Sequence, residues 1–147
     1  MTDAPRTTLV LDTNTVMALW VFEDPALAKL RARIEADDFV LASRSDALEE
    51  LRRVLAYRQF ALEPGRQHAL LEHYAARCAL LAPAPADAPA LPECRDSDDQ
   101  KFLEIARDAQ ADQLVTRDKA LLRLNRHRQV RPLFEILTPE RLCASFD

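Results

Sequence analysis

Short apolar runs alternate with segments of helical periodicity along this chain of 147 residues, and this alternation restricts its fold more than any other feature. Brief runs rich in Val, Ile, Leu and Thr are typical of buried strands. We expect such strands at 7–12, 39–43, 113–116 and 133–137. The spacing of apolar residues and the placing of Pro and Ser predict helices at 25–36, 45–57, 64–79, 97–110 and 119–124, with a terminal helix from Pro139.

Strands that alternate with helices favour a parallel sheet, because the helices cross over its faces between successive strands. We therefore expect an α/β fold with three α/β/α layers and a central, mostly parallel sheet of about four to five strands. The Pro/Ala-rich stretch 80–92 is too short for a linker between domains, so we expect residues 1–147 to form a single domain. In such folds ligands bind beyond the carboxyl ends of the strands.

The composition excludes several classes of chemistry. Gly65 is the only glycine, whereas the Walker A and GxGxxG loops that bind nucleotides need several. Cys78, Cys94 and Cys143 are scattered and form no CxxC pair, which predicts free thiols in a reducing compartment rather than a zinc site. No apolar run approaches the ~20 residues that a membrane-spanning helix needs, so we expect a soluble, cytoplasmic protein without a membrane partner.

Charge is unevenly distributed along the chain, although the net charge is only −4. Segment 117–131 is rich in Arg and Lys, whereas segment 87–112 is rich in Asp and Glu. The overall acidity argues against a protein that coats nucleic acid without specificity. Two interpretations of the basic segment stay open: a solvated surface, or a surface that contacts a polyanion while the acidic region holds a metal ion.

Two acids from distant parts of the chain follow expected strands. Asp12 comes directly after "LVL" and Asp118 after "LVTR". Either one alone is better explained as a turn or cap residue than as a functional group. Because the carboxyl ends of parallel strands share one edge of the sheet, the two acids together favour a site at that edge.

The helix expected at 45–57 carries two adjacent acids that differ in direction. At about 100° per residue, Glu49 points away from the apolar stripe and has Arg53 at i+4, which predicts a solvent-exposed ion pair. Glu50 lies at the edge of the stripe, from where a carboxylate can reach the end of the sheet. Glu50 is therefore the candidate for a site, and Glu49 is expected at the surface.

The stretch "CRDSDDQKFLE" places three acids, Asp96, Asp98 and Asp99, at the start of the helix expected at 97–110. A calcium loop of the EF-hand type is excluded, because its sixth residue would be Lys101 instead of Gly. The spacing of Ser and Gln predicts a capping box, with Ser97 as the cap and Gln100 as its partner. Acids in a first helical turn also interact favourably with the helix dipole.

A cap does not require three acids, so a second role is open for one of them. Asp99 lies on the inward side of the expected helix, one turn before Phe102 and Leu103. Asp98 is only slightly further round, and the helical wheel does not decide between the two.

Carboxylates gathered at one edge repel one another unless a cation neutralises them. Mg²⁺ or Mn²⁺ is the natural partner for ligation by oxygen atoms alone, and such ions complete their coordination with water and phosphate oxygens. The histidines are distant in sequence from these acids and are interpreted as surface or packing residues; they are His68, His73 and His127. The acids therefore predict a metal site that acts on a phosphate ester by activating water.

Three stretches of the sequence, which contain four blocks, resemble the PIN-domain family, and in particular its bacterial toxins of toxin–antitoxin systems. "VLDTNTVMALW" is similar to the family's opening strand and DTN motif, and "ASRSDALEELRRVL" to its second block. "CRDSDDQKFLEIARDAQADQLVTRDKALL" is similar to its third and fourth blocks. The resemblance covers almost the whole chain, and the order of the blocks makes it specific.

This resemblance implies the roles of individual residues. It implies that Mg²⁺ or Mn²⁺ is bound by catalytic acids, here Asp12, Glu50, Asp99 and Asp118, with Asp96 as an additional ligand. Asn14 and Thr116 match positions that support the site. The family also implies a parallel sheet between helices, a homodimer and inhibition by a small antitoxin protein.

The function that we expect is a metal-dependent endoribonuclease that cleaves single-stranded RNA through metal-activated water, as the toxin of a toxin–antitoxin pair. Three basic residues beside Asp118 are expected to contact the RNA backbone: Arg117, Lys119 and Arg123. The alternative is a PIN-like module that binds metal weakly, does not catalyse, and binds RNA or a partner protein. An aspartyl phosphatase is disfavoured, because Asn14 stands where its DxDxT motif needs the second acid.

Overall fold

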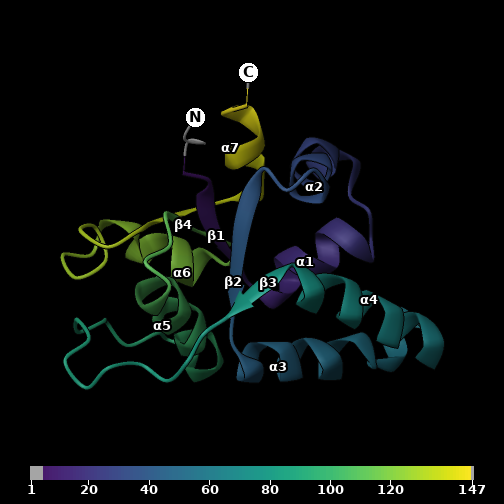
Figure 1. The fold of residues 1–147 in the computed structure, drawn as a ribbon, viewed down its shortest axis with the longest axis horizontal. Coiled ribbons are helices and arrows are strands. Elements are labelled where there is room, and N and C mark those ends of the chain that lie inside the picture. Colours follow the sequence, from purple (N-terminus) through teal and green to yellow (C-terminus); the bar gives the residue numbers. More distant parts are fainter. Residues whose placement is uncertain (1–4, 147) are drawn as a thin grey trace.

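A computed structural model describes residues 5–146, and within them five parallel strands form one sheet (Figure 1). The order of the strands is β3-β2-β1-β4-β5, and every neighbouring pair is parallel. The strands are β1 (Thr7–Leu11), β2 (Phe39–Ser43), β3 (Cys78–Leu80), β4 (Gln113–Val115) and β5 (Glu135–Leu137). The predicted parallel sheet is thus confirmed, and the first strand of the chain lies at its centre.

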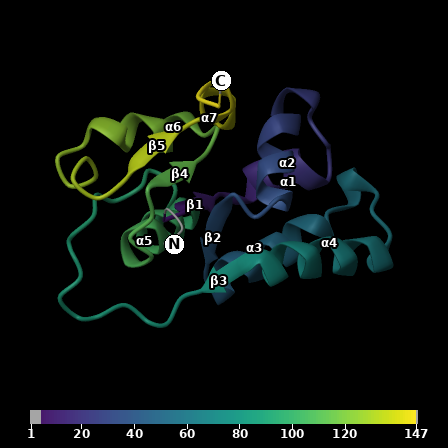
Figure 2. The ribbon, with the colours of Figure 1, turned by 45° about the horizontal axis from the view of Figure 1, so that its top comes forward.

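Helices cover both faces of the sheet and complete the three predicted layers (Figure 2). One face carries α1 (Thr13–Trp20), α2 (Ala28–Glu35), α3 (Ser45–Leu55), α4 (Pro64–Arg77) and α7 (Pro139–Ala144). The other carries α5 (Gln100–Asp108) and α6 (Lys119–Arg123). No helix in residues 5–146 is long and apolar enough to cross a membrane.

Alternate residues of β1 supply the two halves of the core. Leu9 and Leu11 pack with α1 to α4 on one face, whereas Val10 packs with α5 and α6 on the other. A strand segment that is buried on both faces needs apolar residues at successive positions, which explains why Leu9, Val10 and Leu11 follow one another in β1. On the α5 side Leu103 is fully buried, and on the α2 side so is Leu30.

Two elements differ from the sequence-based expectation. The helix α1 was not predicted, because seven of its eight residues are buried and it therefore lacks the polar face that marks an amphipathic helix. The helix expected at 64–79 ends at Arg77, and Cys78–Leu80 instead forms the edge strand β3, which pairs with β2. A strand of three residues is too short to show a period of its own.

Candidate active site

Asp12 lies where β1 passes into α1 and is 6 % exposed. Its Oδ1 accepts a hydrogen bond of 2.9 Å from the backbone N–H of Thr15, and so caps α1. Its Oδ2 accepts a hydrogen bond of 2.5 Å from the hydroxyl of Thr116. Burial raises the pKa of Asp12 against the opposing effect of these hydrogen bonds. Two fixed hydrogen bonds therefore hold a buried carboxylate in one orientation at the carboxyl edge of the sheet.

Thr116 links Asp12 to Asp118 across the end of β4. The Thr116 side chain is fully buried, and its Oγ1 accepts a hydrogen bond of 2.9 Å from the backbone N–H of Asp118. Asp118 caps α6, with its Oδ1 accepting from the N–H of Leu121 at 3.0 Å. The hydroxyl of this one threonine therefore contacts both of the acids that were expected at strand ends.

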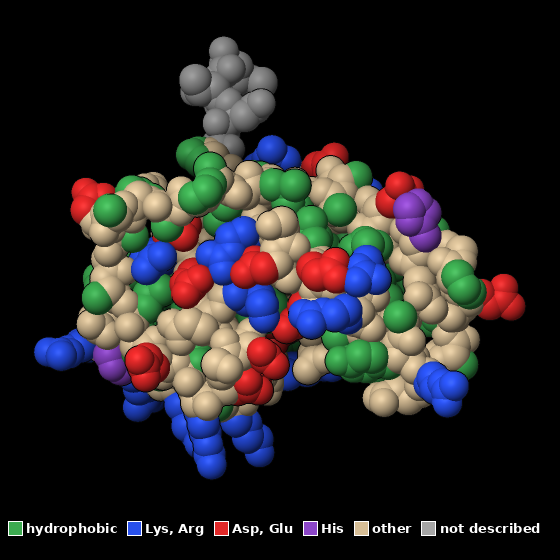
Figure 3. Space-filling model, turned by 90° about the horizontal axis from the view of Figure 1, so that it is seen from below, with side chains coloured by type: hydrophobic (Ala, Val, Ile, Leu, Met, Phe, Trp, Pro, Cys, Tyr) green, Lys and Arg blue, Asp and Glu red, His purple; other side chains and the backbone are tan. Residues whose placement is uncertain are grey.

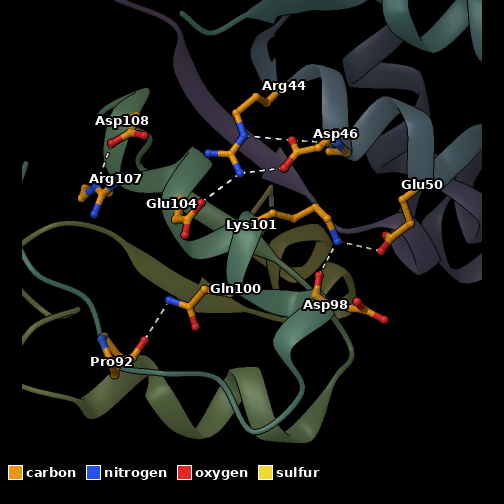
Figure 4. A network of polar contacts seen from close by, with 11 residues as sticks. Arg44, Asp46, Glu50, Pro92, Asp98, Gln100, Lys101, Glu104, Arg107 and Asp108 are labelled. Carbon is orange, nitrogen blue, oxygen red and sulfur yellow. Dashed lines mark hydrogen bonds and ion pairs between the residues drawn. The ribbon is translucent and has the colours of Figure 1, made fainter. Parts of the chain in front are cut away.

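The α3 helix directs its two adjacent acids, Glu49 and Glu50, to different sides, as the helical wheel predicts. Glu50 accepts hydrogen bonds from the hydroxyl of Thr13 and from Lys101 Nζ, the latter at 2.8 Å. Both side chains of the Glu50–Lys101 ion pair are largely buried (Figure 4). Glu49 faces solvent and pairs with Arg52 at i+3, with Nε–Oε2 2.8 Å, so the expected pairing with Arg53 at i+4 is wrong. The partner is Arg52 instead of Arg53, but Glu49 still faces solvent as predicted.

The acidic stretch at 96–99 is a turn of 3₁₀ helix, Ser97–Asp99, placed before α5. Its cap is Asp96, whose Oδ1 accepts from the N–H of Asp98 at 2.9 Å. The predicted capping box of Ser97 and Gln100 is therefore wrong. The Gln100 amide instead holds the preceding connector, accepting from the N–H of Cys94 at 2.7 Å and donating to the carbonyl of Pro92 at 3.1 Å (Figure 4).

The pKa of Asp99 indicates that the acids lie close together. Its pKa is raised to about 6, first by burial and then by repulsion from other carboxylates, which are Asp118, Asp96, Asp12 and Glu50. These acids come from four separate segments of the chain. Their charges act on one another at the same edge of the sheet, which is the arrangement that the sequence predicts.

A cavity of about 300 Å³ opens at these acids. Its polar lining residues are Asp12, Thr13, Asn14, Glu50, Gln59, Asp96, Asp98 and Asp99, and its apolar and aromatic ones are Val54, Tyr57, Phe60 and Phe102. Asn14 is exposed and faces this cavity, whereas Asp118 does not line it. A larger hollow of about 910 Å³ lies at the amino ends of β1 and β2 and contains no comparable group of acids.

A second polar network joins α3 to α5 beside the cavity. The guanidinium of Arg44 binds Asp46 at 2.8 Å and Glu104 at 2.9 Å (Figure 4). Figure 3 shows the molecule from the carboxyl edge of the sheet, and acidic and basic side chains are interleaved across the middle of this view. These ion pairs fix the relative positions of the two helices that carry Glu50 and Asp99, and thereby the width of the cavity.

Metal ligands have to be tested against these contacts. Within residues 5–146 no three Asp, Glu, His or Cys side chains converge closely enough, as they stand, to hold a metal ion. The reason is visible in the contacts, since Glu50 is turned to Lys101 and Asp12 and Asp118 are turned to helix N-termini. The donor set nevertheless fits a hard cation, because the cavity offers carboxylate oxygens and no His or Cys.

The three basic residues expected to contact RNA differ in their surroundings. Arg117 forms ion pairs with Asp24 at 2.7 Å and with Glu140 at 2.9 Å, so its guanidinium is already engaged. Lys119 and Arg123 lie exposed on α6, and no hydrogen bond or ion pair holds either of them within the described part of the chain. Lys119 and Arg123 are therefore more available to a polyanion than Arg117.

Two residues at the site were not identified from the sequence. Lys101 and Thr13 both bind Glu50, and neither has a spacing that marks it as functional. Lys101 had one available signal, since it is the only basic residue between Asp96 and Glu104, three residues after Asp98. The free thiols, by contrast, are confirmed for Cys78, Cys94 and Cys143.

Fold and site together define an α/β domain with an acidic centre at the carboxyl edge of its sheet. The sequence model of the PIN domain matches residues 8–120, which contain Asp12, Glu50, Asp99 and Asp118. The chain therefore belongs to the PIN-domain family and has its nuclease-like fold.

Among solved structures, the chain is similar to PAE2754 from Pyrobaculum aerophilum, with a TM-score of 0.61 and 17 % sequence identity. The match covers 95 % of this chain and 88 % of that one, and at this identity it establishes the fold alone. A comparison with curated proteins gave no match.

Repulsion among the acids leads to a prediction about stability. In the absence of metal, Asp99→Asn is expected to stabilise the fold at pH 7.5 by about 1 kcal/mol, since solvent screens part of the repulsion. The pKa of Asp99 is higher in the folded state than in the unfolded state, so its charge destabilises the fold above about pH 6. The stabilisation of the Asn variant over the wild type should therefore vanish as the pH falls from 6 to about 4, where Asp99 is protonated in both states. Thermal melts of the wild type and the variant in EDTA, at pH 7.5 and at about pH 4, measure this difference in stability. The exposed Asp87→Asn in the 80–92 connector is the control, and a gain independent of pH would contradict the explanation.

Proposed function

We propose that this chain is a Mg²⁺- or Mn²⁺-dependent endoribonuclease that cleaves single-stranded RNA at the acidic cavity. The observation that carries the proposal is the gathering of Asp12, Glu50, Asp99 and Asp118, from separate segments, at the carboxyl edge of the sheet. Membership of a nuclease-like family supports the same reaction class. Without a metal ion, repulsion from the other acids disfavours the charged form of Asp99, and a bound cation would remove this cost.

Each residue has a distinct part in this proposal. When bound, Mg²⁺ or Mn²⁺ would supply a Lewis acid that activates water and stabilises the leaving oxygen. Asp12 would be the fixed ligand, because Thr116 and the N–H of Thr15 hold its carboxylate in place. Asp99 and Asp118 would be further ligands, and Asp96 would assist them. Glu50 would join them by turning away from Lys101.

Asn14 would present its amide to the phosphate that enters the cavity, since it is the exposed polar residue of the α1 end. Hydrolysis in this geometry would leave a 3′-hydroxyl and a 5′-phosphate. The direct test incubates purified protein with a labelled single-stranded RNA and with its duplex, in Mn²⁺ and in EDTA. Cleavage of the single strand in Mn²⁺ alone supports the proposal, and equal cleavage in EDTA contradicts it.

The basic residues of α6 give a graded prediction. The double substitution of Lys119 and Arg123 by Ala is expected to raise KM for RNA about 10-fold and to reduce its salt dependence, because two phosphate contacts are lost. Arg117→Ala should change KM less, since that guanidinium is held by Asp24 and Glu140. Arg6→Ala, at the opposite end of β1, is the matched control. An unchanged KM for the double variant would place the RNA elsewhere.

One observation favours a second function, a PIN-like module that binds RNA or a partner protein without catalysis. The Lys101 ammonium already neutralises Glu50 and lies where a cation would compete for that carboxylate. Calorimetric titration with Mn²⁺ beside the nuclease assay separates the two functions. Binding with turnover favours the nuclease, and binding without turnover favours the module.

The biological setting that we propose is that of a cytoplasmic toxin, a homodimer restrained by a small antitoxin protein. Its support is the resemblance of the DTN, Glu50 and Asp99–Asp118 blocks to bacterial toxins of the family. Light scattering of the purified chain tests the dimer. Growth arrest on expression, relieved by Asp12→Asn, tests the toxicity, and normal growth at high expression would contradict it.

A further inference from the structure

Three aromatic rings form a cluster at the rim of the acidic cavity. Phe60 contacts Phe22 edge-on, with ring centroids 5.5 Å apart, and stacks with Tyr57 at 6.2 Å and an interplanar angle of 16°. Phe22 is 56 % exposed and Tyr57 is 50 % exposed, although both are large apolar side chains. In the described residues the only other large apolar side chain so exposed is Leu80. Two of three such residues thus lie in one cluster, which we call the aromatic rim (Phe22, Tyr57 and Phe60).

The backbone holds the aromatic rim in place. Tyr57 follows α3, and the 3₁₀ turn Arg58–Phe60 brings Phe60 back to it, with the N–H of Phe60 donating to the Tyr57 carbonyl at 3.1 Å. Phe60 is half-buried against the core on the α1 side of the sheet. Phe22 comes from the other side, directly after α1. Phe60 is therefore supported by the core and contacts both other rings, while half of the Tyr57 side chain is open to solvent.

The aromatic rim and the acids share one cavity. Tyr57 and Phe60 line it together with Asp12, Glu50 and Asp99. Gln59, between these two aromatic residues in the sequence, adds an amide to the lining. A ligand that fills this cavity therefore meets both carboxylates and aromatic side chains.

We propose that the aromatic rim is a stacking site for an unpaired nucleobase of the strand whose phosphate lies at the acids; this inference rests on the proposed nuclease function. Exposed aromatic rings beside a backbone-binding groove are a recurring means of binding single-stranded nucleic acid, because every base has a flat face to stack. A paired base is already stacked within its duplex and is not free to lie on Tyr57. The site therefore selects single-stranded substrate.

The acids argue for a base rather than an apolar protein segment as the occupant. A partner helix that covered Tyr57 and Phe60 would also close the cavity and bury Asp12, Glu50 and Asp99 without counter-charges, which is costly. A nucleotide avoids this cost, because its base contacts the rings while its phosphate reaches the acids together with a cation. The heteroatoms of a base can also bind the Gln59 amide, which an aliphatic side chain cannot.

The first test is kinetic and uses Tyr57→Ala, Tyr57→Phe and Leu80→Ala. Tyr57→Ala is expected to raise KM for a short single-stranded RNA about 10-fold while kcat changes less, because stacking acts in binding. Tyr57→Phe keeps the ring and should restore the wild-type KM. Leu80→Ala removes equally exposed apolar surface elsewhere and should have no effect.

The second test does not need cleavage and therefore separates this inference from the proposed function. RNA containing 2-aminopurine is titrated with Asp12→Asn protein and with the Asp12→Asn, Tyr57→Ala double variant. Stacking quenches the fluorescence, so the single variant should quench it and the double variant should not. If the wild type fails to cleave RNA but this difference persists, the stacking site stands and the nuclease function falls.

Two results would overturn the inference. One is a wild-type KM and unchanged quenching for Tyr57→Ala in a protein that cleaves RNA. The other is a change in molar mass by light scattering for Tyr57→Ala without a change in RNA binding, which would make the aromatic rim an interface between copies of the chain.

Discussion

Asp12→Asn is expected to lower Mn²⁺-dependent RNA cleavage about 1,000-fold, because the substitution removes the charge of the best-fixed ligand. Asp12 is the most buried acid of the site and is oriented by Thr15 and Thr116. Asn has nearly the same shape and can keep a hydrogen bond to Thr15, so the fold should survive. The measurement is the cleavage rate of a labelled single-stranded RNA under single-turnover conditions.

The helix α3 offers a matched pair of controls for this experiment. Glu50→Gln removes an acid that faces the cavity, whereas Glu49→Gln removes its neighbour, which faces solvent and pairs with Arg52. We expect a large loss of cleavage for the first and wild-type cleavage for the second. Full activity of a clean preparation of Asp12→Asn would contradict the proposed site, whatever the outcome for α3.

Thr116→Val is expected to lower the free energy of unfolding by about 2–3 kcal/mol, or the melting temperature by about 5–10 °C. The Thr116 hydroxyl donates to the buried carboxylate of Asp12 at 2.5 Å and accepts from the N–H of Asp118 at 2.9 Å. Valine has the same volume but leaves both groups without their partner. Thermal melts in EDTA measure the effect.

Thr116→Ser separates the hydroxyl from the methyl group in this experiment. Serine keeps both hydrogen bonds and should be clearly more stable than the valine variant. Equal stability of the serine and valine variants would show that Thr116 contributes by packing alone, and that the link between Asp12 and Asp118 has no energetic importance.

The layered fold could be predicted from the sequence because its strands are buried on both faces. The runs that form β1, β2, β4 and β5 are short and contain consecutive buried apolar residues, a pattern typical of a covered parallel sheet. The helix α1 could not be predicted because it is buried on almost every side. The strand β3 could not be predicted because it forms only through its pairing with β2, which is distant in sequence. Local periodicity does not contain either kind of information.

The place of the acids could also be predicted, but not their contacts. Asp12 and Asp118 follow strands, and the helical wheel turned Glu50 toward the cavity and Glu49 away, as the structure shows. Lys101 and Glu50 are 51 positions apart and lie on different helices, so no local sequence pattern predicts that they pair. The spacing of Ser97 and Gln100 predicts a capping box, but the carboxylate of Asp96, one residue earlier, caps the turn instead by accepting from the N–H of Asp98.

A crystal soaked in Mn²⁺ tests the central claim most directly, because Mn²⁺ scatters anomalously and marks its own position. We predict a peak at the acidic cavity, about 2.1 Å from a carboxylate oxygen of Asp12 and from an oxygen of at least one other acid among Glu50, Asp99 and Asp118. The same crystal should show Glu50 turned away from Lys101 if that acid is a ligand. A cavity without a peak, at a Mn²⁺ concentration that supports RNA cleavage, would contradict the account.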